Sequence, residues 1–531
     1  MPEQRPLPGV DTRPGPLRTW LASLPYVDAE NAAQAALERL HDINQQALTA
    51  AQRLELLAAF RHSYARLHDA LSGTARQQDP LQPSRALALL TDFTEAMSHG
   101  YKYALRDVID ERPRWGRAKL LSEATHYTLY LLSQLLVCRY QTYQPVTDQS
   151  WREIGDLVRF AETEALPPLR DAEFPYSSGE LHTLNGYRQL ALLRLADPYR
   201  LPSGLIWEAY GYIAGKADQI ELLMHHADDP PPTGVYGLPL DHEPHRSLPV
   251  PTSGIERSSW RWLDARELLR NAQMDLDRIV SGTLPQRLGF SNRLSGGDAV
   301  QLLGRMLGQW THSPQRKAPR FNSSQKIELA PGLDAAYYFL NHCVAFDAAL
   351  YSPPEDEDDI DFSRGQRRGG ADIQRGFRLI ACPTRNRSSG GLSLHLDTVH
   401  DLALRVGQLA LLAPTDSASG PGRDWLVGVV RWLVSKETAG TELGIQYVAR
   451  NPQPVAVRST SGPAQNIQPA LKSELPLADG LRLLTLITPR GLFKPKAVLE
   501  LHQSGQTRQL RCAHLLETGH GFDRFSYELL G

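Results

Sequence analysis

The stretch that decides the fold of the second half of the chain runs from Phe377 to Leu396 and reads FRLIACPTRNRSSGGLSLHL. Its apolar ends predict two β-strands, and the polar segment Arg385–Gly391 predicts the turn that joins them. Asn386 and the serines offer short hydrogen-bonding groups. The glycines allow positive φ and a close approach of the backbone to a ligand. The segment is therefore either an anion-binding strand–turn–strand or an ordinary polar hairpin, and the residues alone favour neither.

Two arginine pairs lie upstream of this stretch. Arg316 and Arg320 delimit the segment RKAPR, immediately before the predicted strand KIELA. Guanidinium groups pair in bidentate fashion with phosphate or with the O6/N7 edge of guanine, and they stack on base planes. Arg364 and Arg368 have the same spacing, but they follow an acidic run and fit a self-neutralising mobile insertion. We therefore expect Arg316 and Arg320 to form a ligand-binding arm, with Arg364 and Arg368 as the alternative.

An RxxxR motif before a first strand, followed by [D/N]xSxxG between later strands, resembles the PilZ domain, a family that binds the bacterial second messenger cyclic di-GMP. The later segments DWLVGVVRWLV and ELGIQYV also resemble the strands of this family. The resemblance implies a six-stranded antiparallel β-barrel that holds cyclic di-GMP on its outside, between the arm and the turn. The residues that match the two motifs, and that we expect to bind the ligand, are Arg316, Arg320, Asn386, Ser388 and Gly391.

The rest of the chain predicts a multidomain α+β protein. Apolar residues recur every three or four positions, as from Leu54 to Leu71, which is typical of amphipathic helices. Asp28 is the expected N-cap of an early helix. Ser504-Gly505 is the expected hairpin turn between two strands near the C-terminus. We expect a disordered tail (1–18), an N-terminal all-α helical domain (19–224), a linker (225–258), connecting helices (259–311), a PilZ-like β-barrel (312–455) with a disordered insertion (352–376), and a small C-terminal β-rich unit (456–531).

The composition of the chain limits its possible binding partners and its cellular compartment. The 531 residues carry 57 Lys and Arg against 59 Asp and Glu, a net charge of −2. This balance argues against nucleic acid or an anionic membrane surface as the partner. Four scattered cysteines without a CxxC motif indicate a reducing compartment. No apolar run approaches the ~20 residues that span a bilayer. We expect a cytoplasmic bacterial protein with no membrane span.

Signatures of catalysis and of metal binding are missing from the sequence. No GxSxG, HExxH, phosphate-loop or dinucleotide motif occurs, so we expect no enzyme, no catalytic residues and no cofactor. Histidines and aspartates gather in a proline-broken segment, where a fixed four-ligand zinc site is disfavoured. These histidines are His225, His226, His242 and His245.

The sequence therefore predicts a cyclic di-GMP receptor that passes its signal to an unknown protein partner through the helical domain. The alternative is a polyanion- or protein-binding adaptor whose PilZ-like barrel binds no nucleotide. An enzyme with its active site in the helical domain is a third interpretation.

Overall fold

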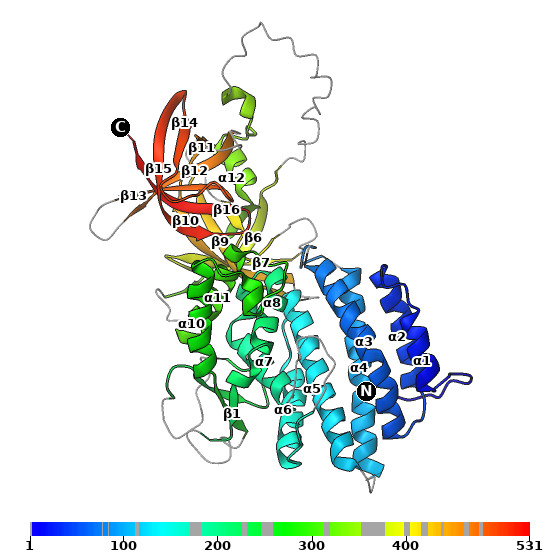
Figure 1. The fold of residues 1–531 in the computed structure, drawn as a ribbon. Helices are drawn as coiled ribbons and strands as arrows, with labels where there is room; N and C mark the ends of the chain where they lie inside the picture. The colour runs from blue at the N-terminus through cyan, green and yellow to red at the C-terminus, as the bar shows by residue number, and fades with distance from the viewer. Residues whose placement is uncertain are drawn as a thin grey trace. The chain divides into compact units, whose positions relative to one another are not determined.

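A computed structural model of the chain divides into two compact units, Met1–Gln315 and Arg316–Gly531, which we describe separately. Figure 1 shows its helices and strands. The structure describes residues 3–76, 78–82, 84–111, 116–169, 182–225, 231–245, 259–312, 319–351, 377–397, 404–415, 423–436, 440–460, 467–476 and 482–530. None of the helices in these ranges combines the length and the apolar character that crossing a membrane requires.

The first unit is built mainly from helices that pack along one another (Figure 1). Their starts are set by local hydrogen bonds: the Asp28 carboxylate accepts from the Asn31 amide, as expected, and Thr49 forms a capping box with Gln52. The helices are α1 (Pro14–Ala22), α2 (Ala29–Asn44), α3 (Ala50–Ala75), α4 (Arg85–Glu111), α5 (Arg117–Gln141), α6 (Asp148–Thr163), α7 (Asn185–Leu195), α8 (Ser203–Ala214), α10 (Arg266–Val280) and α11 (Gly296–Thr311).

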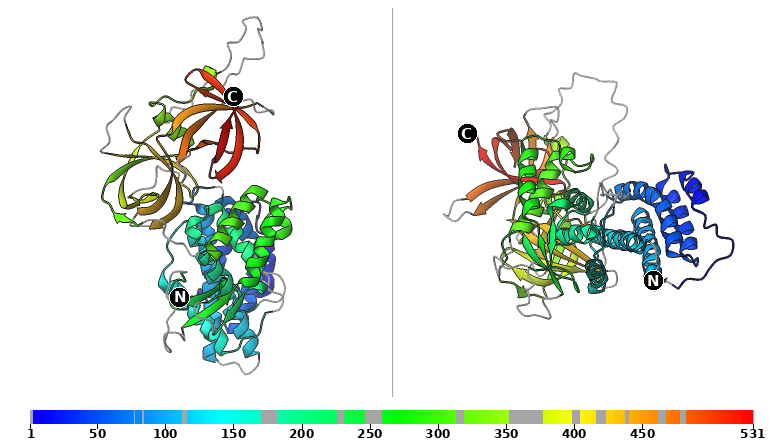
Figure 2. Two further views of the ribbon diagram at one scale, coloured as in Figure 1. Left: turned by 90° about the vertical axis from the view of Figure 1, so that its left-hand side faces the viewer. Right: turned by 60° about the horizontal axis from the view of Figure 1, so that its bottom comes forward.

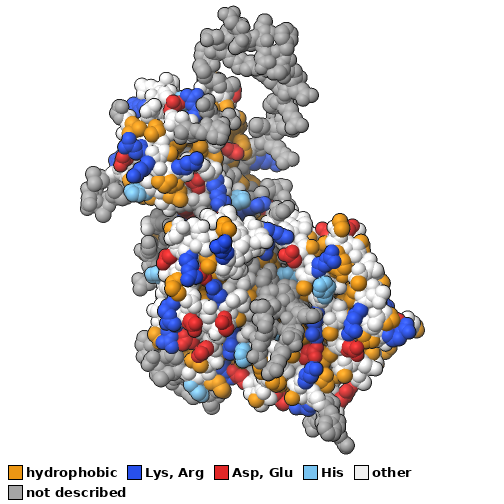
Figure 3. All heavy atoms as spheres, viewed as in Figure 1, with side chains coloured by type: hydrophobic (Ala, Val, Ile, Leu, Met, Phe, Trp, Pro, Cys, Tyr) orange, Lys and Arg blue, Asp and Glu red, His pale blue; other side chains and the backbone are white. Residues whose placement is uncertain are grey.

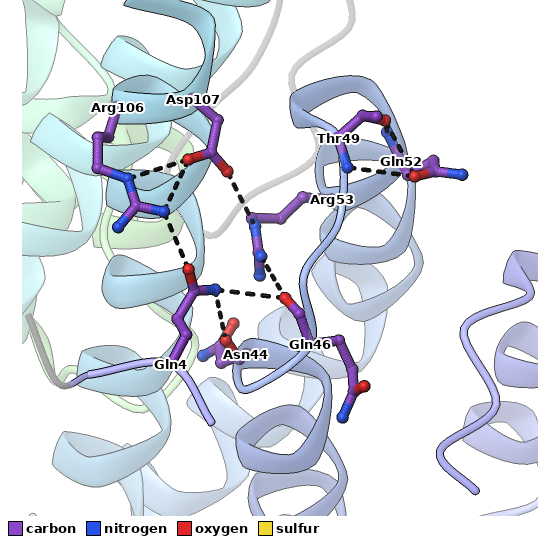
Figure 4. Close-up of polar contacts among 8 residues, drawn as sticks. All are labelled: Gln4, Asn44, Gln46, Thr49, Gln52, Arg53, Arg106 and Asp107. Atoms are coloured by element: carbon purple, nitrogen blue, oxygen red, sulfur yellow. Dashed lines mark hydrogen bonds and ion pairs between the residues drawn. The ribbon is translucent and has the colours of Figure 1, made fainter. Parts of the chain in front are cut away.

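The structure corrects the expectation of a disordered tail over residues 1–18. Gln4 donates to the backbone oxygens of Asn44 (2.9 Å) and Gln46 (3.3 Å), and α1 already begins at Pro14 (Figure 4). The same Gln46 oxygen accepts from Arg53 at 2.8 Å, a guanidinium that is 1% exposed. The tail is therefore held because it supplies donors to carbonyl groups at the end of α2, which a helix leaves without partners.

A small antiparallel sheet also belongs to the helical unit. It contains β1 (Glu221–Leu223), β2 (Val235–Pro239) and β3 (Trp260–Asp264) in the order β1-β3-β2. Because β2 is a paired strand, the expectation that residues 225–258 form only a linker is corrected. The expected connecting helices are part of this unit as well: the buried Trp310 of α11 donates to the Leu192 oxygen of α7 at 3.1 Å.

The second unit begins with the six-stranded antiparallel barrel that the resemblance implied. Its strands follow the order β6-β5-β8-β9-β10-β7, and β7 closes the ring by pairing with β6. A short strand, β4 (Phe321–Asn322), pairs with the far end of β6. The barrel strands are β5 (Lys326–Pro331), β6 (Ile380–Ser388), β7 (Gly391–Leu396), β8 (Leu409–Pro414), β9 (Leu426–Lys436) and β10 (Gly440–Arg450), with α12 (Leu333–Leu340) after β5. The expected insertion at 352–376 lies outside the described residues.

The C-terminal β unit is a second closed barrel, of order β11-β12-β13-β16-β15-β14 (Figure 2). Ser504 and Gly505 both have positive φ (50° and 77°) and form the expected hairpin turn between two of its strands. The strands are β11 (Gln453–Ser459), β12 (Gln468–Pro476), β13 (Arg482–Pro489), β14 (Val498–Gln503), β15 (Gln506–Thr518) and β16 (Phe522–Leu529).

One apolar cluster spans the junction of the two barrels, and the second barrel has a further cluster of its own. Leu471 and Phe522 of the second barrel lie in the same buried cluster as Val429 and Ala449 of the first. Polar contacts reinforce this junction: the His520 amide donates to the Gly407 oxygen at 2.7 Å. The second barrel therefore packs directly against the first barrel and is not connected to it by the chain alone.

Candidate functional site beside the strand–turn of the first barrel

The polar turn of the first barrel is a tight connection between β6 and β7. Ser388 pairs with Gly391, and its hydroxyl donates to the Gly391 oxygen at 3.2 Å. A Cβ added at Gly391 would lie 2.3 Å from the backbone oxygen of Ile445 in β10. Neither Gly390 nor Gly391 adopts positive φ. The close approach to β10, and not a left-handed backbone, is therefore what requires glycine at position 391.

The pairing of β4 with β6 brings the end of the arm to this turn. Phe321 faces Arg387 and Asn322 faces Asn386 across the ladder. Arg320, which is exposed, directly precedes Phe321 in the chain. Two sequence motifs that lie far apart along the chain thus meet at one edge of the barrel.

The expected site residues occupy different places at this edge. Ser388 lines the groove described next, whereas Asn386 shares the half-buried side of β6 with it and Gly391 packs on β10. Arg320 lies beside them at the start of β4. The remaining arm residue, Arg316, lies outside the described residues, as do the alternative pair Arg364 and Arg368.

An open groove of about 750 Å³ lies against the turn. This volume falls within the range of about 300–1,000 Å³ that is common for small-molecule sites. Both barrels of the second unit contribute to its walls. The lining residues are Phe321, Asn322, Ser323, Arg387, Ser388, Ser389, Asp424, Leu426, Tyr447, Val448, Ala449, Arg450, Glu474 and Leu475.

Charges of both signs face this groove. Arg450 donates to the two oxygens of Asp424 at 2.7 and 3.0 Å, and this pairing holds the pKa of Asp424 below its usual value. Burial raises the pKa of Tyr447, whereas the neighbouring Arg387 acts in the opposite direction. Positive and negative side chains are interspersed on the molecular face in Figure 3 as well.

The groove combines groups that suit a ligand with anionic and planar parts. Arg387 lines the groove and offers guanidinium donors for phosphate oxygens or for the acceptor edge of a base. Phe321 is 68% exposed, an unusual state for a large apolar side chain, and it presents a ring on which a planar group can stack. The carboxylate of Glu474 can accept from donor groups of the same ligand.

Sequence reasoning missed several residues of this groove. Arg387 carried a visible signal, because it stands next to Asn386 at a predicted strand end. Asp424 and Tyr447 lie on segments that the resemblance covers, but no motif letter marks them. Glu474 carried no signal at all, since its place depends on how the second barrel packs on the first.

The structure describes part of the histidine segment. His242 bonds to the neighbouring Asp241 at 2.8 Å, and His226 lies outside the described residues. Across the parts of the chain that the structure describes, no group of three or more His, Cys, Asp or Glu side chains is arranged to hold a metal ion.

Three regions of the chain match models of known protein families. Residues 15–228 match the model of the N-terminal domain of the cyclic-di-GMP receptor FimW, residues 351–454 match its middle PilZ domain, and residues 455–530 match the FimW C-terminal beta-barrel domain. The middle match begins after Arg316 and Arg320 and includes Arg364 and Arg368.

A curated relative spans nearly the whole chain. It is the cyclic-di-GMP receptor FimW of Pseudomonas aeruginosa, 23% identical over an alignment of 589 positions that covers 99% of this chain and 92% of the relative. The order of the three matches agrees with the helical unit and the two barrels of the structure. The chain is therefore similar, region by region, to the three domains of FimW, and strands β6 to β10 of its first barrel lie in the region that matches the middle PilZ domain.

Proposed function

We propose that this protein is a non-enzymatic bacterial receptor for cyclic di-GMP, which binds in the groove beside the β6–β7 turn. The observation that carries the proposal is the β4–β6 ladder, which pairs Phe321, the residue after Arg320, with Arg387 in the wall of a groove of suitable size. The similarity to a protein named as a cyclic-di-GMP receptor supports the same ligand.

The chemistry of the groove suits the parts of this ligand. Each phosphate of cyclic di-GMP can take a charge-assisted pair from Arg320 or Arg387. A guanidinium that turns to a guanine instead meets the O6 and N7 acceptors in the same fork geometry. The Phe321 ring offers a stacking surface for one base, and Ser388 offers a short hydroxyl donor.

The arm is proposed to consist of Arg316 and Arg320. Arg320 directly precedes β4, which pairs with β6 beside the turn, and Arg316 is the other arginine of the RxxxR motif. Asn386 and Gly391 are proposed to act by shaping the turn: Asn386 pairs in register with Asn322, and Gly391 allows β7 to approach β10.

The signal is proposed to leave through protein–protein contacts of the helical domain. The first unit ends at Gln315, so Arg316 directly follows it. A ligand that binds Arg316 and Arg320 restrains the connection between α11 and β4. It favours whichever arrangement of the connection binds it more tightly, and it can shift the equilibrium only by that difference in affinity.

Thermal denaturation of the full chain with three nucleotides tests the receptor function. Cyclic di-GMP is expected to raise the melting temperature, because a ligand that binds only the folded state at a hundred times its Kd stabilises by roughly 2.7 kcal/mol. GTP and cyclic di-AMP are expected to have little effect. Equal shifts with all three would point to unspecific anion binding and against the proposal.

A further inference from the structure

We propose that the second barrel completes the ligand site, and that Glu474 of β12 is a specificity-determining residue that binds the N1–H and N2–H donor edge of a guanine. This inference rests on the proposed function and adds the residue that distinguishes guanine from other bases. It also assigns the C-terminal barrel a direct part in ligand recognition.

The placement of β12 carries the first step. Glu474 and Leu475, near the end of this strand, line the same groove as Arg387, Ser388 and Tyr447 of the first barrel. Part of the groove wall is thus formed by the second barrel. A nucleotide that contacts the turn and fills the groove reaches Glu474.

The junction between the barrels fixes Glu474 in this place. Leu471, three residues earlier on β12, is fully buried in the apolar cluster shared with the first barrel. Arg431 of β9 forms a bidentate ion pair with Glu517 of β15, in which the Nη2–Oε2 distance is 3.0 Å. Arg524 donates to the Val448 oxygen, next to the groove, at 3.4 Å. Packing and ion pairs together hold β12 against β10.

Hydrogen bonding distinguishes Glu474 from the other carboxylate of the groove. Both oxygens of Asp424 already accept from Arg450, and Oδ1 also accepts from Asn451 at 3.0 Å. In Glu474, Arg482 donates to Oε2 at 2.8 Å, and no described residue donates to Oε1. Among the described residues, both oxygens of Asp424 therefore have internal donors, whereas Oε1 of Glu474 has none.

The charge of Glu474 indicates which part of the ligand it meets. A carboxylate repels phosphate, so in a site for a dianion it is tolerated only where it faces hydrogen-bond donors. The N1–H and N2–H groups of guanine are two parallel donors, and a carboxylate accepts both at once. Adenine has an unprotonated N1 and no 2-amino group, and hypoxanthine has N1–H but no 2-amino group. Glu474 therefore selects guanine over both.

The test is calorimetric titration of the full-length protein with cyclic di-GMP and with cyclic di-IMP, the analogue that carries hypoxanthine bases. In Glu474→Gln we expect the affinity for cyclic di-GMP to fall about tenfold or more, since a buried donor without its acceptor costs ~1–3 kcal/mol. The affinity for cyclic di-IMP should fall less, so the preference for guanine narrows. Glu474→Asp keeps the charge but moves it back by one methylene, and we expect an intermediate loss.

The matched control is Glu528→Gln, which changes an exposed glutamate of the same barrel that does not line the groove. It should bind both nucleotides as the wild type does. Wild-type or tighter binding of cyclic di-GMP by Glu474→Gln would overturn the inference while leaving the receptor function intact. So would an equal loss with both nucleotides, since that shows no contact with the 2-amino group. A wild-type protein that binds neither nucleotide would overturn the proposed function itself, and the inference with it.

Discussion

The substitution Gly391→Ala tests whether the turn is positioned by its close contact with β10. The added Cβ would lie 2.3 Å from the Ile445 oxygen and 3.2 Å from the Gln446 Cα, both of which are backbone atoms of a paired strand. No flexible side chain can yield here, so β7 and β10 must move apart. Overpacking of this kind costs about 1–3 kcal/mol.

Gly390→Ala is the matched control, because a Cβ at position 390 would meet nothing within 4 Å. For a domain of about 150–250 residues, 1 kcal/mol lowers the melting temperature by about 2–4 °C. Calorimetry without ligand should therefore show a fall of about 2–12 °C for Gly391→Ala and almost none for Gly390→Ala. Hydrogen exchange should also become faster in β7 and β10. Equal melting temperatures for both variants and the wild type would refute the steric argument.

Three further predictions concern the insertion, the turn and the pH dependence. Deleting residues 353–370 should leave the fold intact and leave binding unchanged or tighter, as measured by circular dichroism and titration calorimetry; loss of binding in a folded protein would make Arg364 and Arg368 the arm. Asn386→Ala should weaken cyclic di-GMP binding, whereas Arg364→Ala should leave the affinity nearly unchanged. If calorimetry shows a loss of affinity in Arg364→Ala and none in Asn386→Ala, the assignment of Arg316 and Arg320 as the arm is wrong. The lowered pKa of Asp424 means that its pairing stabilises the fold above the unfolded-state pKa and is lost as pH falls through the folded-state pKa. Asp424→Asn should therefore melt below the wild type at pH 7, and the gap in melting temperature should narrow as pH falls through the folded-state pKa of Asp424. A gap that stays constant as pH falls would show that the ionised carboxylate is not the cause.

The order of the domains could be read from the sequence because each depends on local patterns. Apolar spacing such as Leu54 to Leu71 marks the helices, and Ser504-Gly505 marks a hairpin whose two residues do adopt positive φ. The first barrel was predicted by resemblance, on the motif around Asn386. These features need only a few neighbouring residues to be recognised.

What the sequence did not show depends on contacts between distant segments. The N-terminal tail is held because the Gln4 side chain donates to carbonyl groups at the end of α2. Gln4 and these carbonyl groups are about 40 residues apart in the chain, so the local sequence of the tail does not indicate the contact. The register that pairs Phe321 with Arg387 follows from strand pairing between segments that lie far apart in the chain. Glu474 joins the groove only because one barrel packs on another through residues such as Leu471.

The most direct test of the central claim is titration calorimetry of cyclic di-GMP with the wild type, Arg316→Ala and Arg320→Ala. Each substitution should weaken binding by about ten- to a hundredfold, because one bidentate arginine contact is worth ~1–3 kcal/mol. Arg508→Ala, which removes an exposed arginine of β15 outside the groove, should bind as the wild type does. Wild-type affinity in both arm variants would contradict the account, because the ligand would then bind without the proposed arm.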